Sequence, residues 1–369
     1  MKRGTYLKLK QLGVIMIAWI ILGFIIAVYD HLVIHTHITL GPSEKYSFLI
    51  SILRNMGAGF IGALLGGSTL VFYVNEKYRD KPYGYTILIV SISFVCIIGI
   101  ITLIMGTIIV PIQTGTPLSD PSTQKAFIQF ITDSYPVKSG LVWSFIVALT
   151  QLLLQISSKF GHQTFWNIIS GKYNIPKAEK RIFMFLDINS STTIAEQLGN
   201  ETYHALLKDF FADITNPILE NKGNIYQYVG DEVVIAWNYK DGLERAQCLR
   251  CFFDIKLTIS RMHKKYENRY GLVPSFKAGI HSGDVIAGEV GIVKRDITYS
   301  GDVLNTASRI LGKCNEFNEE IIISADLLSM MNIAKDYGSK ILGSIQLKGK
   351  QQKVCIHALF PKSVHIITH

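Results

Sequence analysis

The chain has 369 residues, of which 49% are hydrophobic and 18% are charged, and its formal net charge is +9. This length suits two domains, and the composition is unusually apolar for a soluble enzyme. Residues 1–180 contain 15 Lys and Arg against 7 Asp and Glu, whereas residues 181–369 contain 22 against 21. The excess positive charge lies in the first half, where it can orient membrane segments. It does not form a nucleic-acid-binding face on the second half, and no nucleic-acid partner is expected.

Four apolar runs lie in the first half of the chain, and a bilayer core of about 30 Å requires roughly 20 apolar residues in a helix. The fourth run is short and carries Gln151 and Gln155, so a buried or interfacial helix is the alternative for it. Gly62 and Gly66 in the second run allow close helix packing, either within one chain or between two chains. We predict a transmembrane domain over residues 1–157, with four helices at about 12–29, 56–74, 85–110 and 141–156.

Basic residues are divided unequally between the two ends of these runs. Eleven lie on the side that carries both termini, and four lie on the other side. By the positive-inside rule, this asymmetry predicts an integral protein of the plasma (inner) membrane with both termini and the C-terminal domain in the cytoplasm. The eleven are Lys2, Arg3, Lys8, Lys10, Lys77, Arg79, Lys81, Lys159, Lys172, Lys177 and Lys180, and the four are Lys45, Arg54, Lys125 and Lys138.

Strands and helices alternate after a basic connector over residues 158–180. Helices are predicted at 193–221, with a break near Gly199, at 243–266 and at 304–314. Strands are predicted at 181–186, 224–228, 232–237, 275–280, 285–290, 321–324, 345–347 and 354–359. Residues 281–284 are expected to form a turn between two of them. Strands mixed with long helices predict a layered α/β sandwich over residues 181–362.

Two aspartates follow or join predicted strands. Asp187 ends the first buried strand, and Asp231 lies in the turn of the 224–237 hairpin. Two carboxylates placed a few ångströms apart repel unless cations lie between them, and hard oxygen ligands suit Mg²⁺ or Mn²⁺. We therefore predict a two-metal phosphoryl-transfer site.

Hydroxyl side chains open the helix that follows Asp187. Ser191 and Thr192 lie at this helix start, where free N–H groups and hydroxyls make an anion cradle. They are predicted to contact the phosphates of a substrate.

An amide and a guanidinium share one face of the predicted helix at 304–314. Asn305 and Arg309 are four residues apart in ITYSGDVLNTASR. A planar, permanently charged group beside an amide suits the stabilisation of a phosphoryl group during transfer.

Five segments in this order resemble the catalytic domain of class III nucleotidyl cyclases: FLDINSST, YQYVGDEVVIAW, AGIHSGDVIAGEVG, YSGDVLNTASR and LKGK. The resemblance covers about 181–360 and implies an α+β sandwich with a ferredoxin-like core. The apolar half is similar to the helical anchors that many such cyclases carry. The resemblance also implies attack of the ribose 3′-hydroxyl on the α-phosphorus of a nucleoside triphosphate, with release of pyrophosphate.

The resemblance assigns roles to several residues. Asp187 and Asp231 match the metal-binding aspartates, and the carbonyl of Ile188 matches a backbone ligand of the two Mg²⁺ or Mn²⁺ ions. Arg309 would contact the α-phosphate, and Asn305 would hold the ribose. In this family the metals are held by one subunit, whereas the Asn, the Arg and the base-reading residues come from the other, which implies a homodimer with two sites. Lys348 matches the lysine that neutralises the outer phosphates.

The base-reading positions depart from the usual pattern. The family's adenine-reading lysine aligns with Gln227, and its partner aspartate aligns with Thr298. Gln and Thr each donate or accept hydrogen bonds, so the pair does not fix the polarity of the base. Thr at this place occurs in a subgroup of adenylyl cyclases, and the Glu typical of guanylyl cyclases is absent from 227. We expect ATP as substrate, with a guanylate or dual-specificity cyclase as the alternative.

Three further readings have less support. A catalytically silent, cyclase-like membrane receptor or scaffold is disfavoured because both aspartates and Arg309 are present. A diguanylate cyclase is disfavoured because its signature needs a double glycine, and Val229 occupies the first of those two places. A transporter is disfavoured because the apolar runs contain few ionisable groups at mid-depth to form a substrate path.

Overall fold

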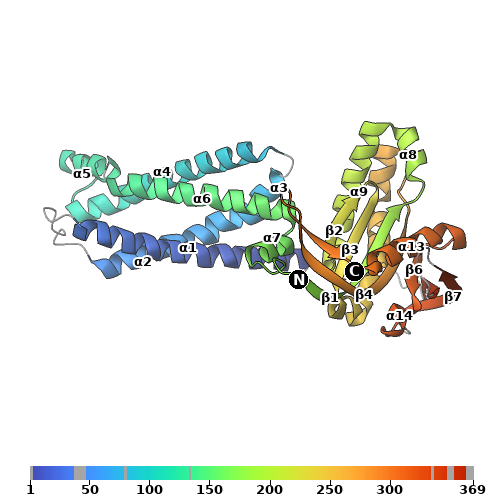
Figure 1. The fold of residues 1–369 in the computed structure, drawn as a ribbon. Coiled ribbons are helices and arrows are strands. Elements are labelled where there is room, and N and C mark those ends of the chain that lie inside the picture. The colour runs from blue at the N-terminus through green and yellow to red at the C-terminus, as the bar shows by residue number, and fades with distance from the viewer. Residues whose placement is uncertain are drawn as a thin grey trace. The chain divides into compact units, whose positions relative to one another are not determined.

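The chain divides into two compact units, Thr5–Ile169 and Ser170–His369. The computed structural model describes residues 3–36, 47–78, 81–132, 134–333, 336–346 and 353–362. Figure 1 labels the helices and strands of both units.

The first unit is helical. Four of its described segments are long and apolar enough to cross a membrane, namely Gly4–Ile34, Ser51–Val74, Tyr83–Ile100 and Pro121–Lys159. The expectation of four apolar helices before the α+β domain is confirmed. The helices run further than the apolar runs because their polar ends are helical as well. They are α1 (Arg3–Thr36), α2 (Phe48–Gly62), α3 (Asn75–Lys77), α4 (Tyr83–Thr114), α5 (Pro121–Thr132), α6 (Ser134–Phe160) and α7 (His162–Ile169), with π-helical turns at Ala63–Gly67 and Leu70–Val74.

Glycines bring the helices of this unit into close contact. A Cβ atom on Gly59 of α2 would lie 2.5 Å from the carbonyl oxygen of Trp19 in α1, and one on Gly23 would lie 2.4 Å from the carbonyl oxygen of Asn55. Gly66 packs against the ring of Phe94 in α4 in the same way. Small residues thus let backbones approach within the chain, which is the first of the two roles predicted for the Gly62–Gly66 spacing.

The second unit is built on one mixed sheet. Its described strands are ordered β2-β3-β1-β4-β6-β8-β7, and β5 pairs with β4 beyond this path. Every pairing is antiparallel except β4 with β6. The strands are β1 (Lys177–Ile188), β2 (Asn224–Val229), β3 (Glu232–Asn238), β4 (Phe276–Val290), β5 (Asp296–Ser300), β6 (Ile321–Ser324), β7 (Tyr337–Gln346) and β8 (Lys353–Pro361). The helices are α8 (Ser191–Leu198), α9 (Asn200–Glu220), α10 (Tyr239–Leu243), α11 (Gln247–Arg261), α12 (His263–Tyr270), α13 (Asp302–Phe317) and α14 (Ala325–Ser329).

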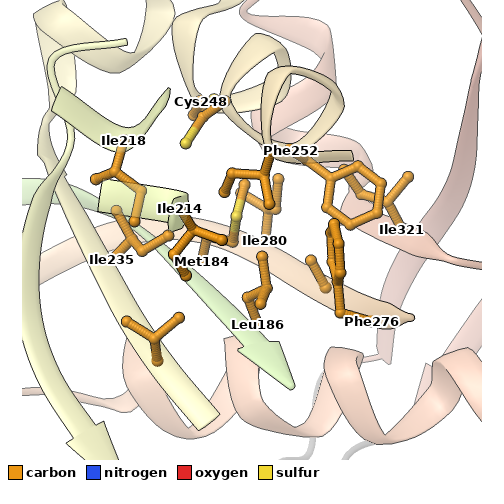
Figure 2. Packing of buried hydrophobic residues seen from close by; sticks show 14 of the residues in the cluster. Met184, Leu186, Ile214, Ile218, Ile235, Cys248, Phe252, Phe276, Ile280 and Ile321 are labelled. Atoms are coloured by element: carbon orange, nitrogen blue, oxygen red, sulfur yellow. The ribbon is translucent and has the colours of Figure 1, made fainter. Parts of the chain in front are cut away.

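Alternate residues of β1 fill two cores, one on each face of the sheet. Met184 and Leu186 pack with residues of α9, α11 and α12, as the close-up in Figure 2 shows for part of this cluster. Phe183 and Phe185 point to the other face and pack against α13. Because side chains of a strand alternate, the apolar residues 182–186 of the strand predicted at 181–186 belong to a strand that is covered on both faces. The predicted α+β sandwich is confirmed.

The expected turn at 281–284 is wrong, because β4 runs unbroken from Phe276 to Val290. Its polar residues have packing roles. The distance between His281 Nδ1 and Ser324 Oγ is 2.8 Å, which makes a hydrogen bond. A Cβ on Gly283 would lie 2.6 Å from Cγ2 of Val303 in α13. The His-Ser-Gly-Asp stretch therefore marks the close approach of a helix to a strand. The helix predicted at 243–266 is also divided, since α11 and α12 meet at Met262.

Gly279 provides a test of the α13–β4 contact. A Cβ there would lie 2.2 Å from the Leu311 amide nitrogen and 2.6 Å from the Ala307 carbonyl oxygen, which are backbone atoms of α13. We expect Gly279→Ala to lower the free energy of unfolding of this unit by about 2 kcal/mol or more, because the helix must move off the sheet. Hydrogen exchange of the β4 amides in the full chain measures the effect.

Gly312→Ala is the matched control. Gly312 is an exposed position of α13 with no atom within 4 Å of an added Cβ. Ala favours the helix over Gly by up to about 1 kcal/mol, so slower hydrogen exchange is expected in this variant. Unchanged exchange in Gly279→Ala would contradict the close packing of α13.

Candidate active site

Strand register brings two aspartates together. In the β1–β3 pairing Asp187 lies opposite Glu232, the residue after Asp231. Asp231 occupies the turn between β2 and β3, where Gly230 takes the left-handed conformation with φ of 64°. This backbone conformation suits glycine, so the Gly-Asp pair forms the tight turn that was predicted. The two carboxyl groups approach closely enough to share a hydrogen bond.

The electrostatics of this place reflect its crowded negative charge. Burial and the neighbouring Asp231 carboxyl raise the pKa of Asp187 to about 6, although Lys277 opposes the shift. Burial raises the pKa of Glu232 to about 7, and the charges of Asp187 and Asp231 add to this effect. A like charge nearby disfavours ionisation of a carboxyl group. A cation between the two carboxyl groups would favour their ionised forms.

The oxygen atoms at this site fit a hard divalent cation. Asp187 and Asp231 offer carboxylates, and the main chain of Ile188 follows Asp187 at the end of β1. Within the described residues, no group of three or more His, Cys, Asp or Glu side chains is arranged to hold a metal ion. Carboxylate and carbonyl ligands, with water and substrate phosphates, are the usual ligands of Mg²⁺. The two aspartates therefore suit an ion that substrate phosphates also bind.

Lys277 is a residue that sequence reasoning missed. It pairs with Asp187 across β1 and β4, and its Nζ lies 3.4 Å from Asp187 Oδ2 and 3.1 Å from Asn315 Oδ1. A lysine in this position provides a fixed positive charge beside the acidic pair. The sequence contains it in a predicted strand, but the order of strands was needed to place it next to Asp187.

The predicted anion cradle lies at the start of α8. Ser191 is half-buried and its hydroxyl contacts Tyr203, whereas Thr192 is exposed. Burial and the charge of Asp231 raise the pKa of Tyr203, although its hydrogen bond with Ser191 opposes this. Ser191 and Tyr203 thus belong to the surroundings of the acidic pair.

Asn305 and Arg309 lie on α13, away from the acidic pair of the same chain. Lys277 links Asp187 to Asn315, near the C-terminal end of α13. Arg309 and Asn305 precede Asn315 by six and ten residues, which is about 9 and 15 Å along a helix axis. Within the described parts of the chain, Arg309 makes no hydrogen bond or ion pair. The structure therefore leaves this face of α13 available to another molecule.

Gln227 and Thr298 lie on β2 and β5. A bulge shifts the β2–β3 register between Ile225 and Gln227, and the Gln227 side chain is exposed. Thr298 is half-buried and pairs with Gly288 of β4. Their neighbours Tyr226 and Tyr299 pack together with ring centroids 5.0 Å apart, so the two strands are joined at this level. Lys348, also predicted as a site residue, lies outside the described residues.

Comparisons with known proteins agree on this domain. Residues 174–360, about half of the chain, match the family model of the adenylate and guanylate cyclase catalytic domain. Adenylate cyclase 2 of Rhizobium meliloti (strain 1021) is 36% identical over 207 residues, which cover 56% of this chain and 57% of that protein. The adenylate cyclase of Anabaena cylindrica is 26% identical over 181 residues, covering 47% of this chain and 35% of that protein.

A solved structure of a bacterial light-regulated adenylyl cyclase has the same fold. It superposes with a TM-score of 0.53 and 19% identity, covering 62% of this chain and 67% of that one. The chain spans little more than half, or less, of the length of the two curated relatives.

The acidic pair predicts how a metal ion changes stability. Near neutral pH we expect Mn²⁺ to stabilise the full-length chain and so to raise its thermal unfolding midpoint. At an Mn²⁺ concentration of 100 times the Kd, the free energy of unfolding should rise by about 2.7 kcal/mol. In EDTA, Asp231→Asn should be more stable than the wild type, because the variant removes the like charge of Asp231 and leaves Lys277 beside Asp187. With Mn²⁺ the order should reverse. Lys313→Gln, which removes a charge that pairs with Glu316 and not with either aspartate, should respond like the wild type.

The sign of the pH dependence follows from the raised pKa of Asp187. Its ordinary pKa is 3.8 and its folded pKa is about 6, so the folded chain holds this proton to higher pH. Stability therefore falls as the pH rises through this window, and the advantage of Asp231→Asn in EDTA should disappear below it. A wild type that Mn²⁺ does not stabilise would contradict the predicted metal site.

Proposed function

Because the chain belongs to the family of adenylate and guanylate cyclase catalytic domains, we propose that it is a membrane-bound adenylate cyclase. It converts ATP to cyclic AMP and pyrophosphate by attack of the ribose 3′-hydroxyl on the α-phosphorus. The observation that carries this proposal is the contact between Asp187 and Asp231 at the end of β1. Two carboxylates held together against their repulsion are the arrangement that this reaction requires.

Asp187, Asp231 and the carbonyl of Ile188 would hold two Mg²⁺ or Mn²⁺ ions. When bound, the ions lower the pKa of the attacking hydroxyl and offset the charge of the phosphates. The chain's own residues orient the triphosphate. Lys277, whose Nζ lies 3.4 Å from Asp187 Oδ2, offers a positive charge to the outer oxygens of the triphosphate. The start of α8, with Ser191 and Thr192, offers hydrogen-bond donors to the phosphates.

The second half of the site is proposed to come from another copy of the chain. On α13, Asn305 is exposed and Arg309 is half-buried, and both lie at a distance along the helix from the acidic pair of their own chain. In a two-fold dimer, each acidic pair can face the Asn–Arg pair of the partner. Arg309 would then stabilise charge on the α-phosphate while Asn305 orients the ribose. Lys348 would complete the phosphate contacts.

The base is proposed to be read by Gln227 and Thr298. Both residues can donate or accept, so ATP is favoured without strict exclusion of GTP. Relatives named adenylate cyclase support this preference. A guanylate or dual-specificity cyclase remains the alternative within the family.

The helical unit is proposed to anchor the enzyme in the inner membrane. Four described segments are long and apolar enough to span it, and basic residues flank the ends that would face the cytoplasm. Both termini and the catalytic domain then lie in the cytoplasm. Helices of two chains would set how the two catalytic domains face each other.

Nucleotide assays test the activity directly. With Mn²⁺, we expect the purified full-length chain to form cyclic AMP, with a kcat/KM for ATP that exceeds that for GTP on the order of tenfold. Arg309→Ala should lower kcat by about 10²-fold or more. A preference for GTP would overturn the adenylate assignment, and turnover of neither nucleotide would favour a catalytically silent receptor or scaffold.

Mixing inactive variants tests whether two chains share each site. Asp187→Ala and Arg309→Ala chains, coexpressed in equal amounts, should recover about a quarter of wild-type activity, because half of the dimers then contain one intact site. Coexpressed Asp187→Ala and Asp231→Ala chains are the matched control. Each site of that heterodimer carries a lesion in its acidic pair, so no recovery is expected. Absence of recovery in both mixtures would exclude the shared site.

A further inference from the structure

Four residues at the start of the catalytic unit form a partly buried polar cluster, which we call the junction cluster: Lys172, Tyr173, Glu179 and Arg181. The Tyr173 hydroxyl accepts hydrogen bonds from Lys172 (2.9 Å) and Arg181 (3.0 Å) and donates to Glu179 (3.2 Å). Arg181 Nε also donates to Glu179 at 2.9 Å. Tyr173 is 1% exposed and Arg181 is 6% exposed.

Charge pairing maintains this cluster although Tyr173 and Arg181 are buried and its other two members are half-buried. Burial alone would raise the pKa of Glu179, but the hydrogen bond and charge of Arg181, with Lys172, outweigh it and lower the pKa. Removing one partner of a buried ion pair leaves the other charge without compensation. The cluster is therefore a rigid unit whose members hold one another in place.

The guanidinium of Arg181 connects the cluster to β5. Its Cζ lies 5.3 Å from the ring centroid of Tyr299, within the range of a cation–π contact. Tyr299 in turn packs on Tyr226 of β2, and its amide donates to the Tyr226 hydroxyl at 3.4 Å. Tyr299 directly follows Thr298 along the chain, and Tyr226 directly precedes Gln227.

A second connection reaches Thr298 through the backbone of β4. The Glu289 amide donates to the Tyr173 carbonyl at 3.1 Å. Pro176 packs on Gly288, the residue before Glu289, since a Cβ on Gly288 would lie 3.2 Å from Pro176 Cγ. Gly288 is the residue that pairs with Thr298 in the β4–β5 register. The segment that leads into β1 thus packs on the part of β4 that pairs with Thr298.

We propose that the junction cluster is a specificity-determining positioning device, which holds Thr298 and Gln227 in the orientation that distinguishes adenine from guanine. Gln and Thr carry both donors and acceptors, so their chemistry alone does not select a base. Selection then depends on how firmly the backbone presents one group of each residue to the base. This role presupposes the cyclase activity proposed above, and the cluster would act through Tyr299 and the backbone of β4.

Two variants of the full-length chain test this role by the ratio of kcat/KM for ATP to kcat/KM for GTP. Tyr173→Phe keeps the ring and removes the hydroxyl that joins the cluster. Arg181→Lys keeps the charge and removes the planar group over Tyr299. Each is expected to lower the ratio about threefold to tenfold, the effect of losing one or two hydrogen bonds. The change should fall on the KM for ATP, because base contacts contribute uniform binding.

Tyr266→Phe is the matched control. Tyr266 is a fully buried tyrosine whose hydroxyl donates to Asp213 at 2.6 Å, between α9 and α12. It should lose thermal stability without changing the nucleotide ratio. An unchanged ratio in Tyr173→Phe and Arg181→Lys, or an equal change in Tyr266→Phe, would overturn the positioning role. A wild type that turns over neither nucleotide would instead overturn the proposed function.

Discussion

The repulsion between Asp187 and Asp231 is the constraint on which the catalytic unit depends. The register of β1 and β3 creates this contact, and the two cores fix that register. A slip by one residue would turn Phe183 and Met184 to the wrong faces of the sheet. Burial of apolar side chains on both faces stabilises the fold and offsets the repulsion between the two carboxylates. The packing of both cores thus holds the two carboxylates side by side, in the arrangement that the proposed metal site needs.

The packing of α13 on β4 separates the two halves of the chemistry. Gly279 and Gly283 let the helix lie directly on the strand, so its axis is fixed relative to the sheet. One end of α13 reaches the acidic pair through Asn315 and Lys277. The other end carries Asn305, which faces outward. A single rigid helix therefore holds one group at its own site and directs another group toward a different surface. This geometry is the physical reason that a second chain enters the proposed mechanism.

Sequence reasoning located the elements that local patterns encode. The apolar run before Asp187, the Gly230–Asp231 turn and the face shared by Asn305 and Arg309 depend on neighbours within a few residues. Features that depend on strand order were missed. Lys277 is an ordinary strand residue until β4 is placed beside β1, and Gly283 suggests a turn until α13 is seen to pack on it. Tyr173 was assigned to a basic connector, although it is buried in the catalytic unit.

Recognition of the base shows why such distant contacts matter. A lysine and an aspartate would impose a donor and an acceptor whatever their surroundings. Gln227 and Thr298 impose neither, so their polarity is decided by the groups that hold their strands. Tyr226 and Tyr299 join those strands, and Arg181 packs on Tyr299 from the start of β1. In the function and positioning role proposed here, selectivity is distributed between the two base-reading residues and the partly buried junction cluster. A substitution in the cluster then changes base selection through the strands that carry Gln227 and Thr298.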